Sequence, residues 1–393
     1  MRIALVGDFD TYLFRGLPRP ESSPQCRLSP GLNLARGFRD AGAKDIHYLV
    51  VTPEVKEVAV DEGPFGVLHR VPCPPLSGSA TFFVRRRQLL LKELGRLRPD
   101  IVHGQGSEDA YALTAVTSPY PHVVTFHGVM HRVLEVEPVP LFSLLQVPRL
   151  LEKVVARKAR HVISISHEVE DFLRRYHSSA KTYRLPNAMA PCFFEVERSP
   201  RGNPDRYQLI YVGGIQPRKG LLYAVEALAA AQLRLGKPVY LQVIGPTSRG
   251  ANAVYENAVR ARAAELNVAN QVTWMGILNE LVVAQAMAAS DALVLPSFWE
   301  NMPMCVGEAM SAGLPVVSTR AAGIPDWVDH GQTGWLVEPG RSDELADALV
   351  QLLSDAALRE RIGAAGRAKA RAQYLPRVVA EKTLGVYREI LSR

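Results

Sequence analysis

Two glutamates eight positions apart are the residues of this chain best suited to chemistry. Residues 292–319, ALVLPSFWENMPMCVGEAMSAGLPVVST, have the pattern of a strand, a loop, a helix that begins after Pro303, and a second strand. Glu300 falls in the loop and Glu308 on the helix, so both lie at the carboxyl end of the first strand. A carboxylate can accept hydrogen bonds from the two adjacent hydroxyls of a ribose. The spacing indicates a nucleotide- or sugar-binding pair, with two solvated glutamates as the alternative.

Backbone amides at the start of the same helix offer a site for an anion. The amides of Met302, Met304 and Cys305 lie where N–H groups have no partner within the helix. The helix dipole adds partial positive charge at this end. We therefore expect these amides to bind phosphate.

A second strand, turn and helix carries two cations. Residues 209–228, LIYVGGIQPRKGLLYAVEAL, place Gly213 and Gly214 in the turn, and Arg218 and Lys219 at the start of the helix. Cations there oppose the helix dipole by about 0.3–1 kcal/mol each. A bound diphosphate would reverse this penalty. Two solvated loop cations are the alternative.

Two histidines follow strands in the first half of the chain. His127 ends the strand in PHVVTFHG, and His103 ends another in DIVHGQG. Either side chain can hydrogen-bond a sugar hydroxyl, and a structural histidine is the alternative for each. The sequence contains no HExxH, GxSxG or Walker motif and no carboxylate-rich cage, so no metal site is predicted.

The elements that must position these residues alternate along the chain as short apolar runs and amphipathic helical stretches. The apolar runs lack a polar face, as expected for parallel strands covered by helices. Strands are predicted at Ile3–Val6, Ile46–Val51, Ile101–His103, Val123–Phe126, His161–Ile165, Leu209–Val212, Val239–Ile244, Val272–Trp274, Ala292–Leu295 and Pro315–Val317. Helices are predicted at Gly31–Asp40, Leu221–Leu235, Ala253–Leu266, Met304–Ala312, Asp343–Leu353 and Leu375–Leu391. This alternation predicts an α/β protein with doubly wound sheets.

Composition limits the class of protein. The 393 residues suggest two or three domains, and 47% hydrophobic with 22% charged residues is an ordinary globular profile. A formal charge of +7 is too mild to indicate a nucleic-acid partner. The four cysteines form no CxxC pair, and we find no signal peptide or apolar run of about 18 residues. These features predict a cytoplasmic protein.

A stretch rich in proline, glycine and charge, residues 186–206, divides the chain. We place the first domain at 1–195 and the second at 196–375, because a new strand restarts the pattern after this stretch. One connection, between Val6 and Gly31, is unusually long. It begins at the carboxyl end of a first strand, where ligands bind in such sheets.

Taken together, these segments resemble the retaining glycosyltransferases of family four, which have the GT-B fold. The most specific segment is the E-x7-E signature, Glu300 to Glu308, within PS-x2-E-x7-EAM-x2-G-x-PVV. Other similar segments are PRKG at 217–220, the strand ends at Gly245 and Gly276, residues 321–340, FHG at 126–128, SIS at 164–166 and LPNAM at 185–189. The resemblance covers nearly the whole chain. It implies two Rossmann-like domains facing each other across a cleft, with the C-terminal helix, 376–393, returning to the first domain.

By residue match, the resemblance implies a donor site in the second domain. Glu308 would hold the ribose and Glu300 the donor sugar, while Arg218 and Lys219 would neutralise the diphosphate. In the first domain, His127 would lie near the transferred sugar and Gly31 near a phosphate or the acceptor. The remaining implied donor contacts are Gly213, Gly214, Gly245, Gly276, Met302, Met304 and Cys305.

The implied reaction moves a sugar from a nucleotide-sugar donor to a sugar or lipid-linked acceptor, with retention and without a cofactor or required metal. Such enzymes build glycans, glycolipids and polysaccharides. The chain departs from the family at Gly214, where arginine is common, and at Pro303, where glycine is common. Alternatives with the same fold are a nucleotide-sugar epimerase and a phosphorylase, although no cofactor lysine can be named. A third alternative is a non-catalytic nucleotide-sugar-binding subunit.

Residues 82–98, FFVRRRQLLLKELGRLR, suggest a membrane-facing helix. Helical periodicity places an apolar stripe inward: Phe83, Leu90, Leu94 and Leu97. Arg85, Lys92 and Arg96 fall on the opposite face, together with Leu89 and Phe82. Large apolar side chains among outward cations suit an anionic lipid surface and predict peripheral association with the inner face of a membrane. A solvated basic face is the alternative.

Overall fold

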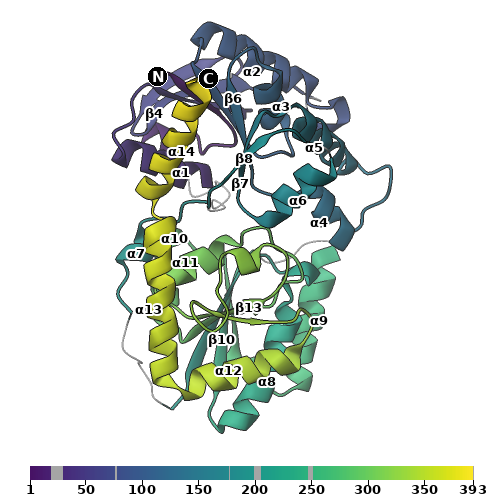
Figure 1. Cartoon of the computed structure of the whole chain (residues 1–393). Coiled ribbons are helices and arrows are strands. Elements are labelled where there is room, and N and C mark those ends of the chain that lie inside the picture. Colours follow the sequence, from purple (N-terminus) through teal and green to yellow (C-terminus); the bar gives the residue numbers. More distant parts are fainter. Residues whose placement is uncertain (19–29, 76–77, 177, 199–204, 247–250, 393) are drawn as a thin grey trace. The chain divides into compact units, whose positions relative to one another are not determined.

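The computed structural model describes residues 1–18, 30–75, 78–176, 178–198, 205–246 and 251–392. It divides into two units: unit 1 contains Met1–Ala188 and Pro376–Arg393, and unit 2 contains Met189–Leu375. Each unit is built on a mostly parallel sheet with helices packed against it (Figure 1). This confirms the predicted α/β class with two Rossmann-like domains.

Unit 1 has an eight-stranded sheet in the order β3-β4-β2-β1-β5-β6-β7-β8. The strands are β1 (Ile3–Val6), β2 (Ile46–Thr52), β3 (Ala59–Gly63), β4 (Gly66–Pro72), β5 (Ile101–Gln105), β6 (His122–Phe126), β7 (His161–Ser164) and β8 (Lys181–Arg184). All neighbouring pairs are parallel except β3 with β4. The strand order reverses between β1 and β5, and ligands of such sheets bind beyond the carboxyl ends of the strands at this point.

The helices of unit 1 include the last helix of the chain. They are α1 (Pro30–Asp40), α2 (Val84–Leu97), α3 (Ala110–Thr117), α4 (Met130–Val136), α5 (Gln146–Lys158), α6 (His167–Arg175) and α14 (Pro376–Leu391), with short 3-10 turns η1 (Leu13–Arg15) and η2 (Ser79–Thr81). Helix α14 packs against α1, so the predicted return of the C-terminal helix is confirmed. The contact is so close that a Cβ atom on Gly37 would lie 2.0 Å from the carbonyl oxygen of Pro376.

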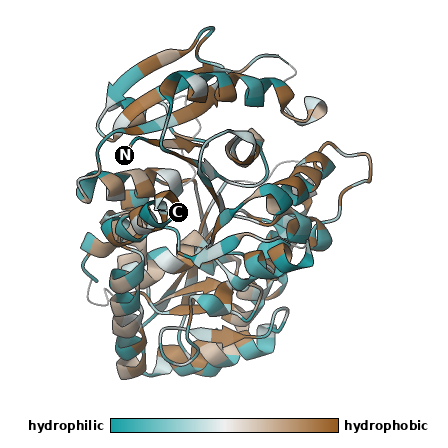
Figure 2. Cartoon of the chain, turned by 45° about the horizontal axis from the view of Figure 1, so that its top comes forward, coloured by the Kyte–Doolittle hydropathy of each residue, from teal (hydrophilic) through white to brown (hydrophobic). Residues whose placement is uncertain are grey.

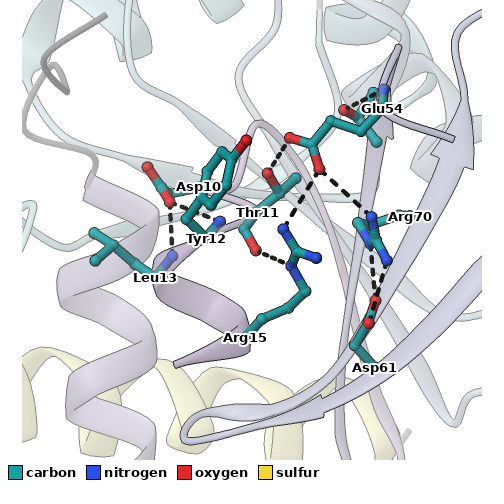
Figure 3. Close-up of polar contacts among 9 residues, drawn as sticks. Asp10, Thr11, Tyr12, Leu13, Arg15, Glu54, Asp61 and Arg70 are labelled. Atoms are coloured by element: carbon teal, nitrogen blue, oxygen red, sulfur yellow. Dashed lines mark hydrogen bonds and ion pairs between the residues drawn. The ribbon is translucent and has the colours of Figure 1, made fainter. Parts of the chain in front are cut away.

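The described part of the long connection after β1 is fixed by polar contacts (Figure 3). Asp10 Oδ1 accepts hydrogen bonds from the amides of Tyr12 and Leu13, at 3.0 and 2.8 Å, and so starts η1. Arg15 and Thr11 both contact Glu54, which follows β2. Residues 19–29, which include most of the rest of this connection, lie outside the described residues.

Unit 2 has a six-stranded parallel sheet in the order β11-β10-β9-β12-β13-β14. The strands are β9 (Tyr207–Val212), β10 (Val239–Ile244), β11 (Val272–Gly276), β12 (Ala292–Leu295), β13 (Val316–Thr319) and β14 (Trp335–Val337). The helices are α7 (Cys192–Glu195), α8 (Leu221–Leu235), α9 (Ala251–Glu265), α10 (Glu280–Ala288), α11 (Met304–Ser311), α12 (Ser342–Ser354) and α13 (Ala356–Gln373), with 3-10 turns η3 (Pro217–Lys219), η4 (Ala269–Gln271) and η5 (Ile324–Asp326). This order reverses between β9 and β12, the switch point of a Rossmann sheet.

The chain passes from unit 1 to unit 2 between Ala188 and Met189, whereas the sequence-based boundary was placed at residue 195. The amide of Met189 donates to the carbonyl oxygen of Tyr374, at 3.0 Å. Arg367 donates to the carbonyl oxygen of Phe194, at 2.7 Å. Residues 189–195 therefore pack on unit 2, although their sequence has no strand or long helix to mark this.

Candidate active site

The loops after β9 and β12 bring the predicted cations and the first glutamate together at the switch point of unit 2. Arg218 and Lys219 lie in η3, which follows β9, and Glu300 lies in the loop after β12. The amide of Phe298 donates to the carbonyl oxygen of Arg218 at 2.8 Å, which ties the two loops to each other. These residues are far apart in the sequence, and the parallel pairing of β9 with β12 makes them neighbours.

The side chains of Arg218, Lys219 and Ser297 all contact one carboxylate oxygen of Glu300. Glu300 Oε1 lies 2.7 Å from the Lys219 ammonium and 3.3 Å from the Arg218 guanidinium. It also accepts a hydrogen bond from the Ser297 hydroxyl at 3.3 Å. The side chains of Lys219, Arg218 and Glu300 are only 17%, 14% and 10% exposed. Two cations and one carboxylate leave one net positive charge in a largely buried site, which suits a polyanionic ligand.

The second glutamate of the signature, Glu308, is buried with one carboxyl oxygen that accepts no hydrogen bond. Glu308, on α11, is 1% exposed, and its Oε2 atom has no hydrogen-bond partner. Burial, together with the smaller effect of the negative charge of Glu280, raises the pKa of this carboxyl group to about 8. A buried carboxyl oxygen without a donor is destabilising by roughly 1–3 kcal/mol. The position is therefore suited to a ligand that brings hydroxyl donors.

The start of α11 has the open amide end expected for anion binding. Pro303 precedes the helix, and no side chain caps it by a hydrogen bond. Met302 and Cys305 are buried, and Met304 is half-buried. The Cys305 thiol lies close enough to feel the charges of Lys219, Glu308 and Glu300, so these groups share one neighbourhood. Burial raises the pKa of this thiol to about 12, and it is therefore no nucleophile at neutral pH.

The predicted donor-site glycines cluster at the carboxyl ends of three neighbouring strands of unit 2: Gly213, Gly214, Gly245 and Gly276. A Cβ atom on Gly245 would lie 1.9 Å from the carbonyl oxygen of Gly213. The Gly245 amide donates to the carbonyl oxygen of Gly276 at 2.9 Å. The chain of Lys219 passes over Gly213, with Cδ 3.2 Å from the position of a Cβ atom there. Gly245 therefore allows the ends of β9 and β10 to pack tightly, whereas a Cβ atom on Gly276 would meet nothing within 4 Å.

Unit 1 has a pocket at the carboxyl ends of β5 and β6. It is lined by Pro30, Leu34, His103, Gln105, Thr125, His127, Ile163, Ile165, Leu185, Pro186, Asn187, Ala188, Val379 and Thr383. His127 contacts Gln105 through Nε2, at 2.8 Å, and Asn187 through Nδ1, at 3.0 Å. Burial lowers the pKa of His127 to about 4, so the ring is neutral at physiological pH and one nitrogen remains an acceptor. Gly31 is buried in the first turn of α1, next to the lining residue Pro30.

His103 is held entirely by the protein. Its Nδ1 lies 2.5 Å from the hydroxyl of Tyr387 on α14, and its Nε2 lies 2.7 Å from the hydroxyl of Thr125. Burial lowers its pKa to about 3. Both ring nitrogens are engaged and the side chain is only 1% exposed, whereas His127 is half-buried, so the structural alternative fits His103 better than the binding of a sugar hydroxyl. Gln105 lies between the two histidines, with Nε2 2.9 Å from His103 Nε2.

Sequence reasoning missed three polar residues of these sites: Ser297, Gln105 and Asn187. Ser297 stands in the PS pair directly after a strand, and Gln105 ends the strand that contains His103. Asn187 belongs to the LPNAM segment. For Ser297 and Gln105 the available signal was a polar residue at the carboxyl end of a buried strand, whereas Asn187 follows the exposed edge strand β8 and has no such signal. In the described part of the chain, no three His, Cys, Asp or Glu residues are grouped to hold a metal ion.

Comparisons with known proteins identify the family of both halves. Residues 194–369 match the family described as Glycosyl transferases group 1, and residues 32–191 match the family described as Glycosyltransferase Family 4. The chain belongs to the group 1 glycosyltransferases. The family resemblance predicted from the sequence is thereby confirmed.

Named relatives of this glycosyltransferase include sugar transferases that match most of its length. Alpha-D-kanosaminyltransferase of Streptomyces kanamyceticus is 28% identical over 326 residues, which are 80% of this chain and 82% of that protein. MMP alpha-(1->4)-mannosyltransferase of Mycolicibacterium hassiacum is 26% identical over 398 residues, which cover 98% of this chain and 91% of that protein.

Solved structures of similar fold cover the whole glycosyltransferase. Sucrose-phosphate synthase from Thermosynechococcus elongatus superimposes with a TM-score of 0.77 at 20% identity, over 100% of this chain and 99% of that chain. HepE from Anabaena, solved in complex with UDP-glucose, has a TM-score of 0.72 at 17% identity, over 99% and 100%. At such identities these structures show the GT-B fold alone.

Proposed function

We propose that this glycosyltransferase takes a sugar from a nucleoside diphosphate donor bound in unit 2 and transfers it to an acceptor hydroxyl with retention of the anomeric configuration. The observation that supports this most strongly is the buried, unpartnered Oε2 of Glu308. Ribose presents two adjacent hydroxyl donors, which would satisfy this carboxylate. Glu308 would thus bind the ribose, about one turn along α11 from the uncapped start of the helix.

The diphosphate would lie against Arg218 and Lys219. Its negative charges can replace those of Glu300 as partners of the two cations, because these cations outnumber the carboxylate they share. The leaving diphosphate gains charge in the transition state, and cations that are already in place stabilise that charge. We propose that no metal or cofactor is needed for this reason. Glu300 would then bind the hydroxyls of the donor sugar.

Three groups complete the proposed donor contacts. The amides of Met302, Met304 and Cys305 would bind phosphate oxygens at the start of α11. The glycines at 213, 214, 245 and 276 would let the nucleotide approach the strand ends closely. In unit 1, His127 would hydrogen-bond the transferred sugar as a neutral ring, and Gly31 would lie near the acceptor.

The names of the relatives are compatible with this proposal. HepE was solved with UDP-glucose, and two relatives are named for the transfer of kanosamine and mannose. The sugars in these names differ from one another. The names therefore support a nucleotide sugar as the class of donor and do not identify which sugar is transferred. A role in glycan, glycolipid or polysaccharide synthesis is part of the proposal.

Two experiments test the proposal. A thermal-shift panel with UDP, GDP and ADP identifies the base, since a ligand at a hundredfold excess over Kd adds roughly 2.7 kcal/mol to the free energy of unfolding. With the donor found, NMR of the product reports the anomeric configuration. No shift with any nucleotide contradicts the donor site, and an inverted product contradicts retention. Sugar interconversion without release of the nucleoside diphosphate would indicate an epimerase, and binding without turnover a non-catalytic subunit.

A further inference from the structure

The connection between α4 and α5, together with the end of α4 and the start of α5, exposes a concentration of large apolar side chains. Six of the eighteen exposed side chains of this kind in the described residues lie between positions 136 and 150. They are Val136, Leu141, Phe142, Leu144, Leu145 and Leu150. Phe142 is 97% exposed and Leu141 is 77% exposed. We call residues 136–150 the apolar loop. It projects beyond α4 and α5 in Figure 1 and is drawn largely in brown in Figure 2.

Hydrogen bonds hold the tip of the apolar loop in a defined turn. The Ser143 amide donates to the carbonyl oxygen of Pro140 at 2.9 Å, which places Leu141 and Phe142 at the two central positions. The Leu145 amide donates to the Ser143 hydroxyl at 3.3 Å. Glycine, proline, asparagine, aspartate and serine dominate such positions. Two bulky apolar residues here gain no burial within the described structure, so folding gives no reason for their presence.

The base of the apolar loop is fixed by a buried carboxylate. Glu152, on α5, accepts hydrogen bonds from the Ser107 hydroxyl at 2.9 Å and from the amides of Met130 and His131 at 3.0 and 3.1 Å. The last two contacts join α5 to the start of α4. The apolar tip therefore connects two helices, α4 and α5, that are hydrogen-bonded to each other through Glu152.

The outward charge of α5 is uniformly positive. Its cations are Arg149, Lys153, Arg157 and Lys158, of which the last two are exposed and the first two are half-buried. Its single acid is Glu152, which is fully buried. Helix α5 therefore presents four cations and no exposed carboxylate. The nearby acids are Glu137, half-buried in the apolar loop, and the exposed Glu135 on α4, which pairs with Arg132 at 2.9 Å and Arg175 at 3.5 Å.

The helix predicted to face a membrane contributes less apolar surface than its sequence suggested. The inward stripe of α2 is buried as predicted, but Leu89 is half-buried. Arg86 pairs with Asp109 at 3.3 Å. Phe82 and Val84, at the start of the helix, remain 50% and 41% exposed. They follow η2, which packs against α5, so they lie beside the basic helix of the apolar loop.

We propose that the apolar loop inserts into an anionic lipid surface, with the cations of α5 at the level of the headgroups. Large apolar side chains beside a cationic helix face have the chemistry of interfacial membrane binding. A symmetric dimer through this surface would place the cations of one α5 against those of the other, which is repulsive. No helix in the described residues is long and apolar enough to cross a membrane, so the association would be peripheral. This proposal does not depend on the proposed donor site.

Vesicle flotation of the full chain tests the proposal, with vesicles of phosphatidylcholine alone and of phosphatidylcholine and phosphatidylglycerol in equal parts. We expect binding to the anionic vesicles that weakens with salt. Leu141→Ser with Phe142→Ser should lower the partition coefficient roughly tenfold or more, because two large apolar side chains no longer enter the lipid. Melting temperature and hydrolysis of the sugar nucleotide should not change, since both residues are exposed.

Matched variants locate the surface. Leu233→Ser removes a leucine that is 84% exposed on α8 of unit 2, and should leave binding unchanged. Arg157→Glu with Lys158→Glu should abolish the preference for anionic vesicles. Three outcomes would overturn the proposal: binding to neither vesicle, loss of binding only with Arg85→Glu and Lys92→Glu on α2, or self-association that the double serine variant removes. The last outcome would make a second copy of the chain the occupant.

Discussion

The ammonium group of Lys219 lies 2.7 Å from Oε1 of Glu300, the same oxygen that the Arg218 guanidinium contacts at 3.3 Å. The two cations that we expect to bind the diphosphate are thus already paired with a carboxylate. Replacing Arg218 and Lys219 by alanine should lower kcat/KM by about two orders of magnitude, if the pair stabilises charge on the leaving group. Steady-state kinetics measures this. Binding of the nucleoside without phosphates should hardly change, and an equal loss for nucleoside and nucleoside diphosphate would show that the pair acts through the fold.

The Glu300→Gln variant separates the two roles of this cluster. It removes the competing carboxylate charge while keeping the size of the side chain. We expect binding of the nucleoside diphosphate to stay the same or tighten, because the cations are released, whereas turnover of the sugar nucleotide should fall. Calorimetry and kinetics on the same variant test both parts. Weaker binding of the nucleoside diphosphate would contradict the idea that Glu300 competes with the ligand.

Glu308→Ala should weaken nucleotide binding by roughly 1.5–3 kcal/mol, the range for hydrogen bonds to a charged group. Calorimetry with the base identified in the thermal-shift panel measures the change. Glu280→Ala is a companion variant with the opposite expectation, because it removes a negative charge that helps to raise the pKa of Glu308, so nucleotide binding should not weaken. A Kd unchanged in Glu308→Ala removes this residue from ribose binding.

The raised pKa of Glu308 predicts that nucleotide binding depends on pH. Burial raises this pKa to about 8, and a carboxyl group must lose its proton to accept from both ribose hydroxyls. Kd should therefore fall about tenfold per unit as pH rises towards 8, and then level off. Glu308→Gln carries no such proton and should lose this part of the dependence. Identical pH profiles for the two proteins would contradict the ionised form.

The raised pKa of Glu308 also makes the stability of the unliganded protein depend on pH. The pKa of Glu308 is higher in the folded protein than the ordinary 4.5, so the folded state binds more protons between pH 4.5 and about 8. Stability from this group is complete below the lower value and is lost as pH rises through the window. Denaturant unfolding across that range should show a smaller loss for Glu308→Gln than for the native protein.

His127→Ala should impair turnover of the sugar nucleotide more than binding of the bare nucleotide. Burial lowers the pKa of His127 to about 4, so its neutral ring should give no inflection in kcat/KM between pH 6 and 7. Its contribution to stability is present above about 6.5 and is lost as pH falls through 4. Gln105→Ala, which removes the partner of Nε2, should give a smaller defect in kcat. Full activity of His127→Ala excludes the residue from the site.

The close packing of α1 on α14 predicts that Gly37→Ala destabilises unit 1 by about 1–3 kcal/mol, because the new methyl group meets the backbone of Pro376. Gly385→Ala is the matched control on α14, since a Cβ atom there has nothing within 4 Å. Denaturant unfolding compares the two variants. Equal stability of both would show that α14 can shift away from α1 without penalty.

The fold class and most elements could be predicted from sequence because strands that are buried on both faces of a sheet have short, continuously apolar sequences. The strands Ile3–Val6, Val239–Ile244 and Ala292–Leu295 were predicted with the bounds that the structure has. Strands β3, β4, β8 and β14 were not predicted. Strands β3, β8 and β14 lie at sheet edges, where half-exposed positions such as those of KTYR carry no continuous apolar signal, and the run of β4, GVLHRVP, is interrupted by His69 and Arg70.

The sequence alone determined which residues could carry the chemistry of the donor site, since the spacing of Glu300 and Glu308 and the cations after β9 are local patterns. It could not show that Glu300 already binds both cations, or that Glu308 lacks a partner. Likewise, it placed apolar residues on α2 as a lipid surface, whereas tertiary packing left the most exposed ones at Leu141 and Phe142. Local patterns record what a segment buries, but only the folded chain decides which polar atoms meet and which apolar side chains stay in water.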